Sequence, residues 1–173
     1  MALDPMTDEQ SSAPGAHIWG WMNPAELEWL RSTAATMDSA VEVGSLRGRS
    51  AFALLTGCPG PVYCVDPWDD ARSESRPAFE ENCGHFPNLV MIQGYSPAAA
   101  AEVPDVDFVF IDGAHDYASV VADLDAWTPK ARRLISGHDY YDTDAWSVRT
   151  AVDQRFGGRV ELVPGTAIWT VAT

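Results

Sequence analysis

The chain has 173 residues, of which 46% are hydrophobic, and its formal net charge at pH 7 is −14. This length predicts one domain that can bury a core, and no apolar run approaches the roughly 20 residues needed to cross a bilayer. Lys and Arg are few and unclustered, which argues against nucleic acid and anionic membranes as partners. Three cysteines, without metal-ligand spacing, are interpreted as reduced thiols of a cytoplasmic protein: Cys58, Cys64 and Cys83.

Residues 1–16 are polar and contain Pro, Ser and Gly, so we expect a disordered tail, followed by one domain over residues 17–173. Within the domain, helix and strand patterns alternate. Helices are predicted at residues 24–36, 50–56, 73–82, 116–127 and 146–156, with a helical turn at 97–102. Strands are predicted at 40–43, 62–65, 89–92, 106–111 and 133–136, followed by a hairpin of 159–163 and 168–172.

This alternation predicts an α/β fold with a Rossmann-like, seven-stranded, mostly parallel sheet, helices on both faces and a C-terminal antiparallel hairpin. Right-handed crossovers bring the carboxyl ends of parallel strands to one edge of such a sheet, where ligands bind. Acidic or hydrogen-bonding side chains occur at the ends of the first five predicted strands. We therefore expect the functional site at this edge.

The segment VEVGSLRGRS at residues 41–50 combines a strand, a tight turn and the start of a helix. Gly44 and Gly48 let the backbone approach a ligand and adopt positive φ, and the helix that begins at Ser50 directs its N-terminus to the turn. The glycines are four apart, which does not match G-x-G-x-x-G, and Glu42 suits a cationic or amine-bearing ligand better than a pyrophosphate. By itself, a glycine turn after a strand is also common as a purely structural connection without a ligand.

Asp66 ends the second predicted strand, about twenty residues after the glycine turn, where an acid can accept hydrogen bonds from both hydroxyls of a ribose. The alternative is a solvated acid in a turn. Trp68 follows closely; it covers an adenine ring, or it belongs to the core.

Asp112 follows the apolar fourth strand, and His115 comes three residues later at the start of a helix. Because imidazole titrates near neutral pH, His115 is a candidate general base, with helix capping as the alternative. His138 and Asp139 follow the fifth strand. If the two strands are neighbours, Asp112, His138 and Asp139 can bind a divalent cation such as Mg²⁺ or Mn²⁺; a hydrogen-bonded acid–histidine group without metal is the alternative.

Together these residues resemble class I S-adenosylmethionine-dependent methyltransferases. More narrowly, they resemble methyltransferase family 24 and the metal-dependent O-methyltransferases of macrolide sugars and catechols. The similarity runs from about residue 19 to the C-terminus. Its segments are VEVGS at 41–45, GRS at 48–50, VDPW at 65–68, GYS at 94–96, IDGAHDY at 111–117, Asp123-Leu124 with Trp127, and GHDY at 137–140.

The resemblance implies an S-adenosylmethionine site in which Glu42, Gly44 and Ser45 hold the methionine part. It also implies that Asp66 binds the ribose and that Ser96 lies near the adenine. The full set of expected cofactor-binding residues is Glu42, Gly44, Ser45, Gly48, Ser50, Asp66, Trp68, Gly94, Tyr95, Ser96 and Asp112.

For the chemistry, the resemblance implies that Asp112, His138 and Asp139 occupy the Mg²⁺-binding positions of metal-dependent relatives. It implies that His115 occupies the position of the base in sugar-methylating relatives. The chain departs from the family pattern at two places: KARR stands at 130–133 in place of Pro-Gly-Gly, and His138-Asp139 replaces an acid–acid or acid–amide pair. The acceptor site is expected from the N-terminal aromatic segment and the loops at 68–88 and 140–147, or from a second subunit of a homo-oligomer.

The expected function is O-methylation of a hydroxyl on a small molecule, such as a sugar, a natural product or a phenol. Asp112 and His115 are the expected catalytic residues, assisted by a divalent metal. The alternative is a protein of the same fold that is non-catalytic or has a different reaction, such as a nucleotide-sugar or NAD-binding enzyme. The glycine spacing argues against an NAD site.

Overall fold

The computed structural model describes residues 8, 11–69 and 74–173. Its strands are β1 (Ala40–Val43), β2 (Val62–Asp66), β3 (Leu89–Gln93), β4 (Val106–Ile111), β5 (Ala131–Gly137), β6 (Glu161–Leu162) and β7 (Trp169–Ala172). They form one seven-stranded sheet in the order β3-β2-β1-β4-β5-β7-β6. Strands β1 to β5 are parallel, whereas β7 is antiparallel to both β5 and β6. The predicted sheet and its C-terminal hairpin are confirmed.

The helices are α1 (Pro24–Ala34), α2 (Arg49–Gly57), α3 (Ser75–Cys83), α4 (Ser96–Ala99), α5 (Tyr117–Trp127) and α6 (Val148–Phe156). Short 3-10 turns follow at Ala100–Glu102, Thr128–Lys130 and Gly157–Arg159. The predicted helix at 146–156 begins two residues later. The reason is that an isolated bridge pairs Asp142 with Ser147 and keeps Trp146 in the preceding loop.

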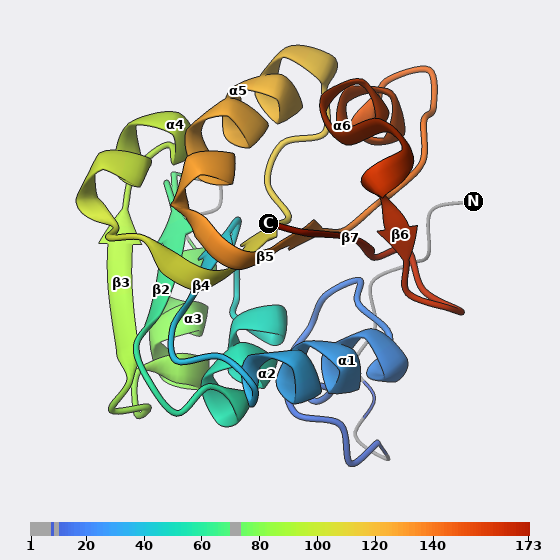
Figure 1. The fold of residues 1–173 in the computed structure, drawn as a ribbon. Coiled ribbons are helices and arrows are strands. Elements are labelled where there is room, and N and C mark those ends of the chain that lie inside the picture. Colours follow the sequence, from blue (N-terminus) through green and yellow to red (C-terminus); the bar gives the residue numbers. More distant parts are fainter. Residues whose placement is uncertain (1–7, 9–10, 70–73) are drawn as a thin grey trace.

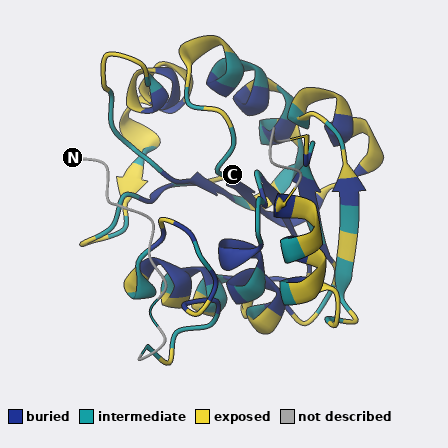
Figure 2. Ribbon diagram, turned by 180° about the vertical axis from the view of Figure 1, so that it is seen from behind, coloured by how far each residue is buried: buried dark blue, intermediate teal, exposed yellow. Residues whose placement is uncertain are grey.

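The sheet separates two layers of helices, with α1, α2 and α3 on one face and α4, α5 and α6 on the other (Figure 1). Alternating side chains of β1 explain this: Val41 and Val43 pack with α5 and α6, whereas Ala40 packs with α1 and α2. The inner strands are buried, while β6 and part of the edge strand β3 are exposed (Figure 2). The three cysteines are buried and unpaired on the α1–α3 side.

The N-terminal segment is held against the start of α2 by a buried arginine. The Arg49 guanidinium donates hydrogen bonds to the carbonyl oxygens of Ala16, Ile18 and Met22. Ala16 is buried, although it was assigned to the expected tail. Residues 1–7 and 9–10 of that tail lie outside the described residues, as does residue 73 of the predicted third helix.

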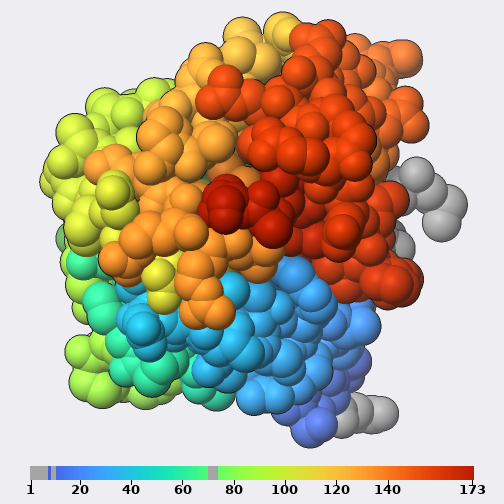
Figure 3. Space-filling model, in the orientation of Figure 1, coloured from blue at the N-terminus to red at the C-terminus, as the bar shows by residue number. Residues whose placement is uncertain are grey.

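Helix α1 lies close to the segment that connects β6 and β7. The N-terminal segment and α1 lie directly below the C-terminal strands on the face seen in Figure 3. The backbone N–H of Ala167 donates to Glu26 of α1, which joins these regions. Among the described residues, every helix is too short or too polar to cross a bilayer.

Candidate active site

A cavity of about 1000 Å³ opens at the carboxyl ends of the parallel strands. The topology therefore brings together most of the predicted site residues, as expected for a sheet of this kind. Those that line the cavity are Gly44, Ser45, Ser50, Asp66, Gly94, Tyr95, Ser96, Asp112, His115, His138 and Asp139. Glu42, Gly48 and Trp68 do not line it.

Both glycines of the first turn have a φ of +92°, so their backbone conformations favour glycine. A Cβ atom on Gly44 would lie 2.1 Å from the carbonyl oxygen of Asp112. A Cβ atom on Gly48 would lie 2.6 Å from the Cys83 Sγ. At each position a side chain would collide with neighbouring protein atoms. At Gly44 these belong to the residue after β4, and at Gly48 they belong to α3.

Glu42 is a residue of β1, and its side chain is completely buried on the α1–α3 side of the sheet. Among the described residues, neither of its carboxyl oxygens has a partner in hydrogen-bond geometry, and the buried Ser45 hydroxyl has none either. Burial raises the pKa of Glu42 to about 8, although the nearby Ser45 and Ser50 hydroxyls counter part of the rise. Burial therefore favours the protonated form of this carboxyl group in the folded protein.

Asp66 organises the loop at the end of β2. Its carboxylate accepts the backbone N–H groups of Leu46 at 2.9 Å and Trp68 at 2.7 Å. The Trp68 indole packs on Phe79 and donates to the Leu46 carbonyl at 2.8 Å. The structure therefore assigns the Trp68 ring to the core below the sheet, which corrects its expected place over an adenine.

Asp123 of α5, which was not predicted as a site residue, lies beside the predicted Ser96 that follows β3. The Ser96 hydroxyl donates to the buried Asp123 of α5 and accepts from the Trp127 indole N–H at 2.7 Å. Burial raises the pKa of Asp123. Tyr95 is exposed and contacts Asp69 through its hydroxyl. Asp123 lines the cavity, so it is a further polar group on this wall.

His115 is held between an acid and an aromatic ring. Its Nε2 lies 2.8 Å from Asp139 Oδ2, and its ring stacks on Trp146 with centroids 4.2 Å apart. Tyr141 donates its hydroxyl hydrogen to Asp139 Oδ1 at 2.9 Å. Burial lowers the pKa of His115, but the hydrogen bond to Asp139 and the charge of Asp112 outweigh it and raise the pKa overall. His115 and Asp139 thus form a fixed pair in the cavity wall.

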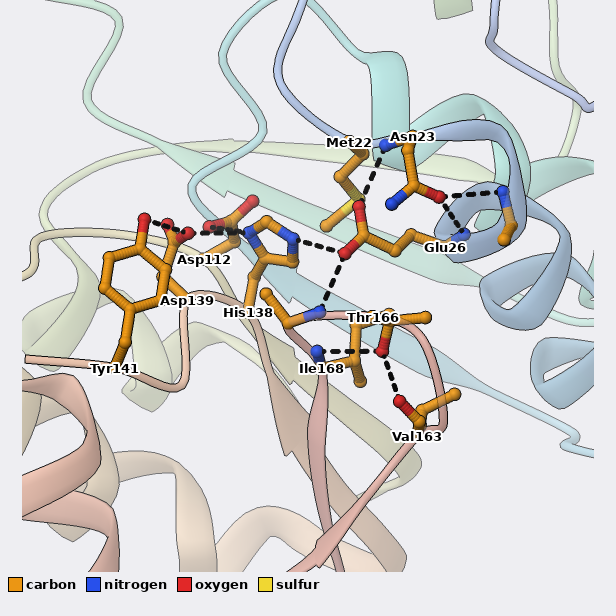
Figure 4. Close-up of polar contacts among 12 residues, drawn as sticks. Met22, Asn23, Glu26, Asp112, His138, Asp139, Tyr141, Val163, Thr166 and Ile168 are labelled. Atoms are coloured by element: carbon orange, nitrogen blue, oxygen red, sulfur yellow. Dashed lines mark hydrogen bonds and ion pairs between the residues drawn. The ribbon is translucent and has the colours of Figure 1, made fainter. Parts of the chain in front are cut away.

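Asp112, His138 and Asp139 converge at the ends of β4 and β5 (Figure 4). One ligand atom from each lies within 4.8 Å of the others. His138 Nδ1 is 3.2 Å from Asp139 Oδ1 and 3.9 Å from Asp112 Oδ1. On its other side, His138 Nε2 is 3.1 Å from Glu26 Oε1.

The charges in this group are strongly coupled. Burial lowers the pKa of His138, but Asp139 and Glu26 outweigh it and raise the pKa well above its usual value. Burial raises the pKa of Asp112 to about 6, whereas contacts with His115 and His138 hold the pKa of Asp139 well below its usual range. The group can therefore satisfy its own charges, and it can also offer two carboxylates and an imidazole to a cation.

Sequence reasoning missed Glu26 and Arg49 as residues of the site. Asn23 and Glu26 form a capping box at α1, and that pattern predicts only a helix start. Arg49 belongs to the glycine-containing segment 41–50, but the carbonyl groups that it binds lie about thirty residues earlier in the chain. The spacing of residues along the sequence does not predict such a long-range hydrogen bond.

The profile of a protein family described as a methyltransferase domain matches residues 41–140, which is more than half of the chain. The chain belongs to this methyltransferase family. Its fold is the Rossmann-like fold of the class I methyltransferases. No curated protein matches the chain with significant similarity.

Solved structures of the same fold include an O-methyltransferase from Bacillus cereus in complex with S-adenosylhomocysteine. It is 16% identical, with a TM-score of 0.68 over 88% of this chain and 82% of that chain. The O-methyltransferase TomG of Streptomyces achromogenes, involved in tomaymycin synthesis and bound to S-adenosylmethionine, is 14% identical, with a TM-score of 0.66 over 88% and 81%. A methyltransferase of Podospora anserina bound to S-adenosylhomocysteine is 14% identical, with a TM-score of 0.66 over 87% and 78%.

Proposed function

We propose that this methyltransferase methylates a hydroxyl oxygen of a small molecule, such as a sugar, a natural product or a phenol. The observation that carries the proposal is a single cavity lined by the glycine turn, by Asp66 and by the His115–Asp139 pair. The cavity thus combines a place for a nucleoside cofactor with a fixed imidazole. The similar structures from Bacillus cereus and Streptomyces achromogenes are both described as O-methyltransferases, which supports oxygen as the acceptor atom.

Several cavity residues fit the cofactor. The buried Ser45 hydroxyl, unpartnered within the described part of the chain, is available to the methionine part beside Gly44. Asp66 lines the cavity at the end of β2 and, as an acid, can accept from ribose hydroxyls, so it is the candidate for the ribose. Gly94, Tyr95 and Ser96 line the wall proposed for the adenine. When bound, S-adenosylmethionine supplies a methyl group that is already activated on a sulfonium, so the protein needs mainly to align the acceptor.

His115 is the proposed general base. Asp139 accepts the hydrogen of Nε2, which leaves Nδ1 as the basic atom of the ring. Nδ1 would take the proton of the acceptor hydroxyl, and the bound cofactor would supply the methyl group to the acceptor oxygen. Trp146 stacks on the imidazole and limits its rotation, so the base is held in one orientation.

Asp112, His138 and Asp139 are the proposed ligands of a divalent cation. The donor set fits such an ion, because one atom of each residue lies within 4.8 Å of the others and two are carboxylate oxygens. When bound, the ion lowers the pKa of the acceptor hydroxyl and orients it. Trp19, Trp21, Met22 and Tyr141 line the rest of this side and are the proposed walls of the acceptor site.

Two measurements test the proposed function. Calorimetric titration with S-adenosylhomocysteine should give saturable binding, whereas NAD⁺ should not bind. A methyl-transfer screen over sugars, phenols and other hydroxyl compounds, with and without EDTA, should find turnover that EDTA removes and Mg²⁺ or Mn²⁺ restores. Binding of NAD⁺ in place of S-adenosylhomocysteine would contradict the cofactor assignment. Turnover that EDTA does not change would exclude the proposed metal but remain consistent with His115 as the base.

A further inference from the structure

Glu26 is a buried acid whose position is fixed from two sides. It is 2% exposed and lies in the first turn of α1. Its Oε2 accepts the Asn23 backbone N–H at 2.8 Å, and its Oε1 accepts the Ala167 backbone N–H at 2.9 Å. The carboxylate therefore cannot turn away from His138 without leaving two backbone donors unpaired.

This fixed carboxylate keeps a hydrogen on Nε2 of His138, so only Nδ1 has to be without a hydrogen when a metal binds. Glu26 Oε1 lies 3.1 Å from His138 Nε2 and, as an ionised oxygen, can only accept. The hydrogen on that side must come from Nε2. Nδ1 is then the nitrogen that faces the cavity, toward Asp112 Oδ1 and Asp139 Oδ1 (Figure 4).

A carboxylate that accepts the second N–H of an imidazole is the common support of a metal-binding histidine. We propose that Glu26 is a positioning residue that presents His138 Nδ1 as a metal ligand. We further propose that the resulting nitrogen-containing set makes the site prefer Mn²⁺ to Mg²⁺. This inference rests on the proposed function, because it names the kind of cation that the same site takes.

The preference follows from the chemistry of the ligands. Mg²⁺ favours oxygen ligands in near-ideal octahedral geometry. Mn²⁺ also suits carboxylates, but as a first-row transition metal it accepts an imidazole nitrogen more readily than Mg²⁺ does. Asp139 is also constrained, because Tyr141 and His115 each contact one of its oxygens. A site with one buried nitrogen donor and a held carboxylate therefore suits Mn²⁺ better than an ion that demands oxygen.

The test uses the full-length protein, Mn²⁺ as the probe and electron paramagnetic resonance as the readout. The resonance signal of free Mn²⁺ should decrease as protein is added. Displacement of bound Mn²⁺ by added Mg²⁺ should show that Mg²⁺ binds at least about tenfold more weakly. The electron spin echo of bound Mn²⁺ should carry ¹⁴N modulation from an imidazole. That modulation should persist in His115→Gln and in the control His85→Gln, and disappear in His138→Asn.

The positioning role has its own variant. Glu26→Ala should weaken Mn²⁺ binding by about 10- to 100-fold, the usual loss when the partner of a ligand histidine is removed. His138→Asn should bring the affinities for Mn²⁺ and Mg²⁺ closer together, because it offers an oxygen in place of nitrogen. If Glu26→Ala does not fold, Glu26→Gln, which keeps the size of the side chain, replaces it in the same titration, and Mn²⁺ affinity equal to that of the parent would exclude the positioning role.

Three results would overturn the inference: no Mn²⁺ binding, Mg²⁺ binding as tight as Mn²⁺, or ¹⁴N modulation that survives in His138→Asn. Failure to bind Mn²⁺ would indicate that a protonated His138, rather than a metal ion, balances the charges of Asp112 and Asp139. Calorimetry with S-adenosylhomocysteine separates this inference from the proposed function. Cofactor binding without Mn²⁺ binding removes only the metal, whereas Mn²⁺ binding without cofactor binding removes only the proposed function.

Discussion

Nε2 of His115 lies 2.8 Å from Oδ2 of Asp139, and this contact connects the end of β5 with the loop that follows β4. The contact fixes the tautomer of the imidazole and leaves Nδ1 as its basic atom. Asp139 itself has a φ of +56°, a conformation that non-glycine residues seldom adopt, so the fold tolerates local strain where this carboxylate is placed.

The first prediction concerns His115. His115→Ala should lower the rate of methyl transfer by roughly 10²–10⁴, the usual contribution of a general base, and should leave binding of S-adenosylhomocysteine nearly unchanged. The measurements are steady-state kinetics and calorimetry. His85→Ala, a histidine that packs beside Phe86 outside the cavity lining, is the matched control and should keep the parent rate. A fully active His115→Ala protein would exclude the imidazole as the base.

The second prediction concerns Asp66. Asp66→Asn should weaken binding of S-adenosylhomocysteine by ~1.5–3 kcal/mol, the range for a hydrogen bond to a charged group. The control is Asp105→Asn, which changes an exposed acid next to the start of β4. Because Asp66 also accepts from Leu46 and Trp68, thermal unfolding must be measured in parallel. Equal calorimetric affinities for parent and variant would contradict the ribose assignment.

The sequence predicted the sheet well because its signals are local. Apolar runs such as 106–111, each followed by a polar residue, indicate buried parallel strands, and right-handed crossovers bring the carboxyl ends of such strands to one edge. The same logic placed Asp66, Asp112 and Asp139 at one edge. Glu26 could not be predicted in this way, because its contacts with His138 and Ala167 join segments more than one hundred residues apart.

The directions of two side chains, those of Glu42 and Trp68, could not be predicted for a different reason. The sequence indicates which residues lie near a strand end, but not whether a side chain points into the cavity or below the sheet. Glu42 and Trp68 point to the α1–α3 side and lie in the core. Gly44 was expected to make room for the cofactor, whereas a Cβ atom there would first meet the backbone of Asp112.

The third prediction therefore concerns stability rather than binding. Gly44→Ala should lower the free energy of unfolding by at least ~1–3 kcal/mol, because alanine is strained at positive φ and its Cβ would contact Asp112. Gly158→Ala is the matched control, since nothing described lies within 4 Å of its Cβ atom. Urea denaturation compares them. A Gly44→Ala protein with parental stability but no cofactor binding would instead support direct contact with the ligand.

The fourth prediction concerns the N-terminal segment. Arg49→Lys should lower the free energy of unfolding by roughly 1.5–3 kcal/mol, because one ammonium group cannot reproduce the planar contacts with the three carbonyl groups. Hydrogen exchange over residues 16–22 should become faster. Arg31→Lys, an exposed arginine of α1, is the control and should change neither quantity. Unchanged exchange in Arg49→Lys would show that other contacts hold the segment.

The last prediction concerns Glu42 and pH. The pKa of this carboxyl group is raised from an ordinary value of 4.5 to about 8 in the folded protein, mainly by burial. Between these values the unfolded chain has lost its proton while the folded protein keeps it. The folded state therefore binds more protons, so its stability must fall as pH rises, by up to about 1.4 kcal/mol for each pH unit.

Glu42→Gln removes this titration while keeping the size and neutrality of the protonated side chain. The variant should therefore gain stability relative to the parent as pH rises from about 5 to 8, and the difference should become constant above the folded pKa. Urea denaturation at several pH values measures the gain, with the exposed Glu161→Gln as the control that should follow the parent curve. Parallel curves for Glu42→Gln and the parent would mean that the carboxyl group ionises in the folded protein as readily as in the unfolded chain. In that case the Ser45 and Ser50 hydroxyls would offset the cost of burying the charged carboxylate.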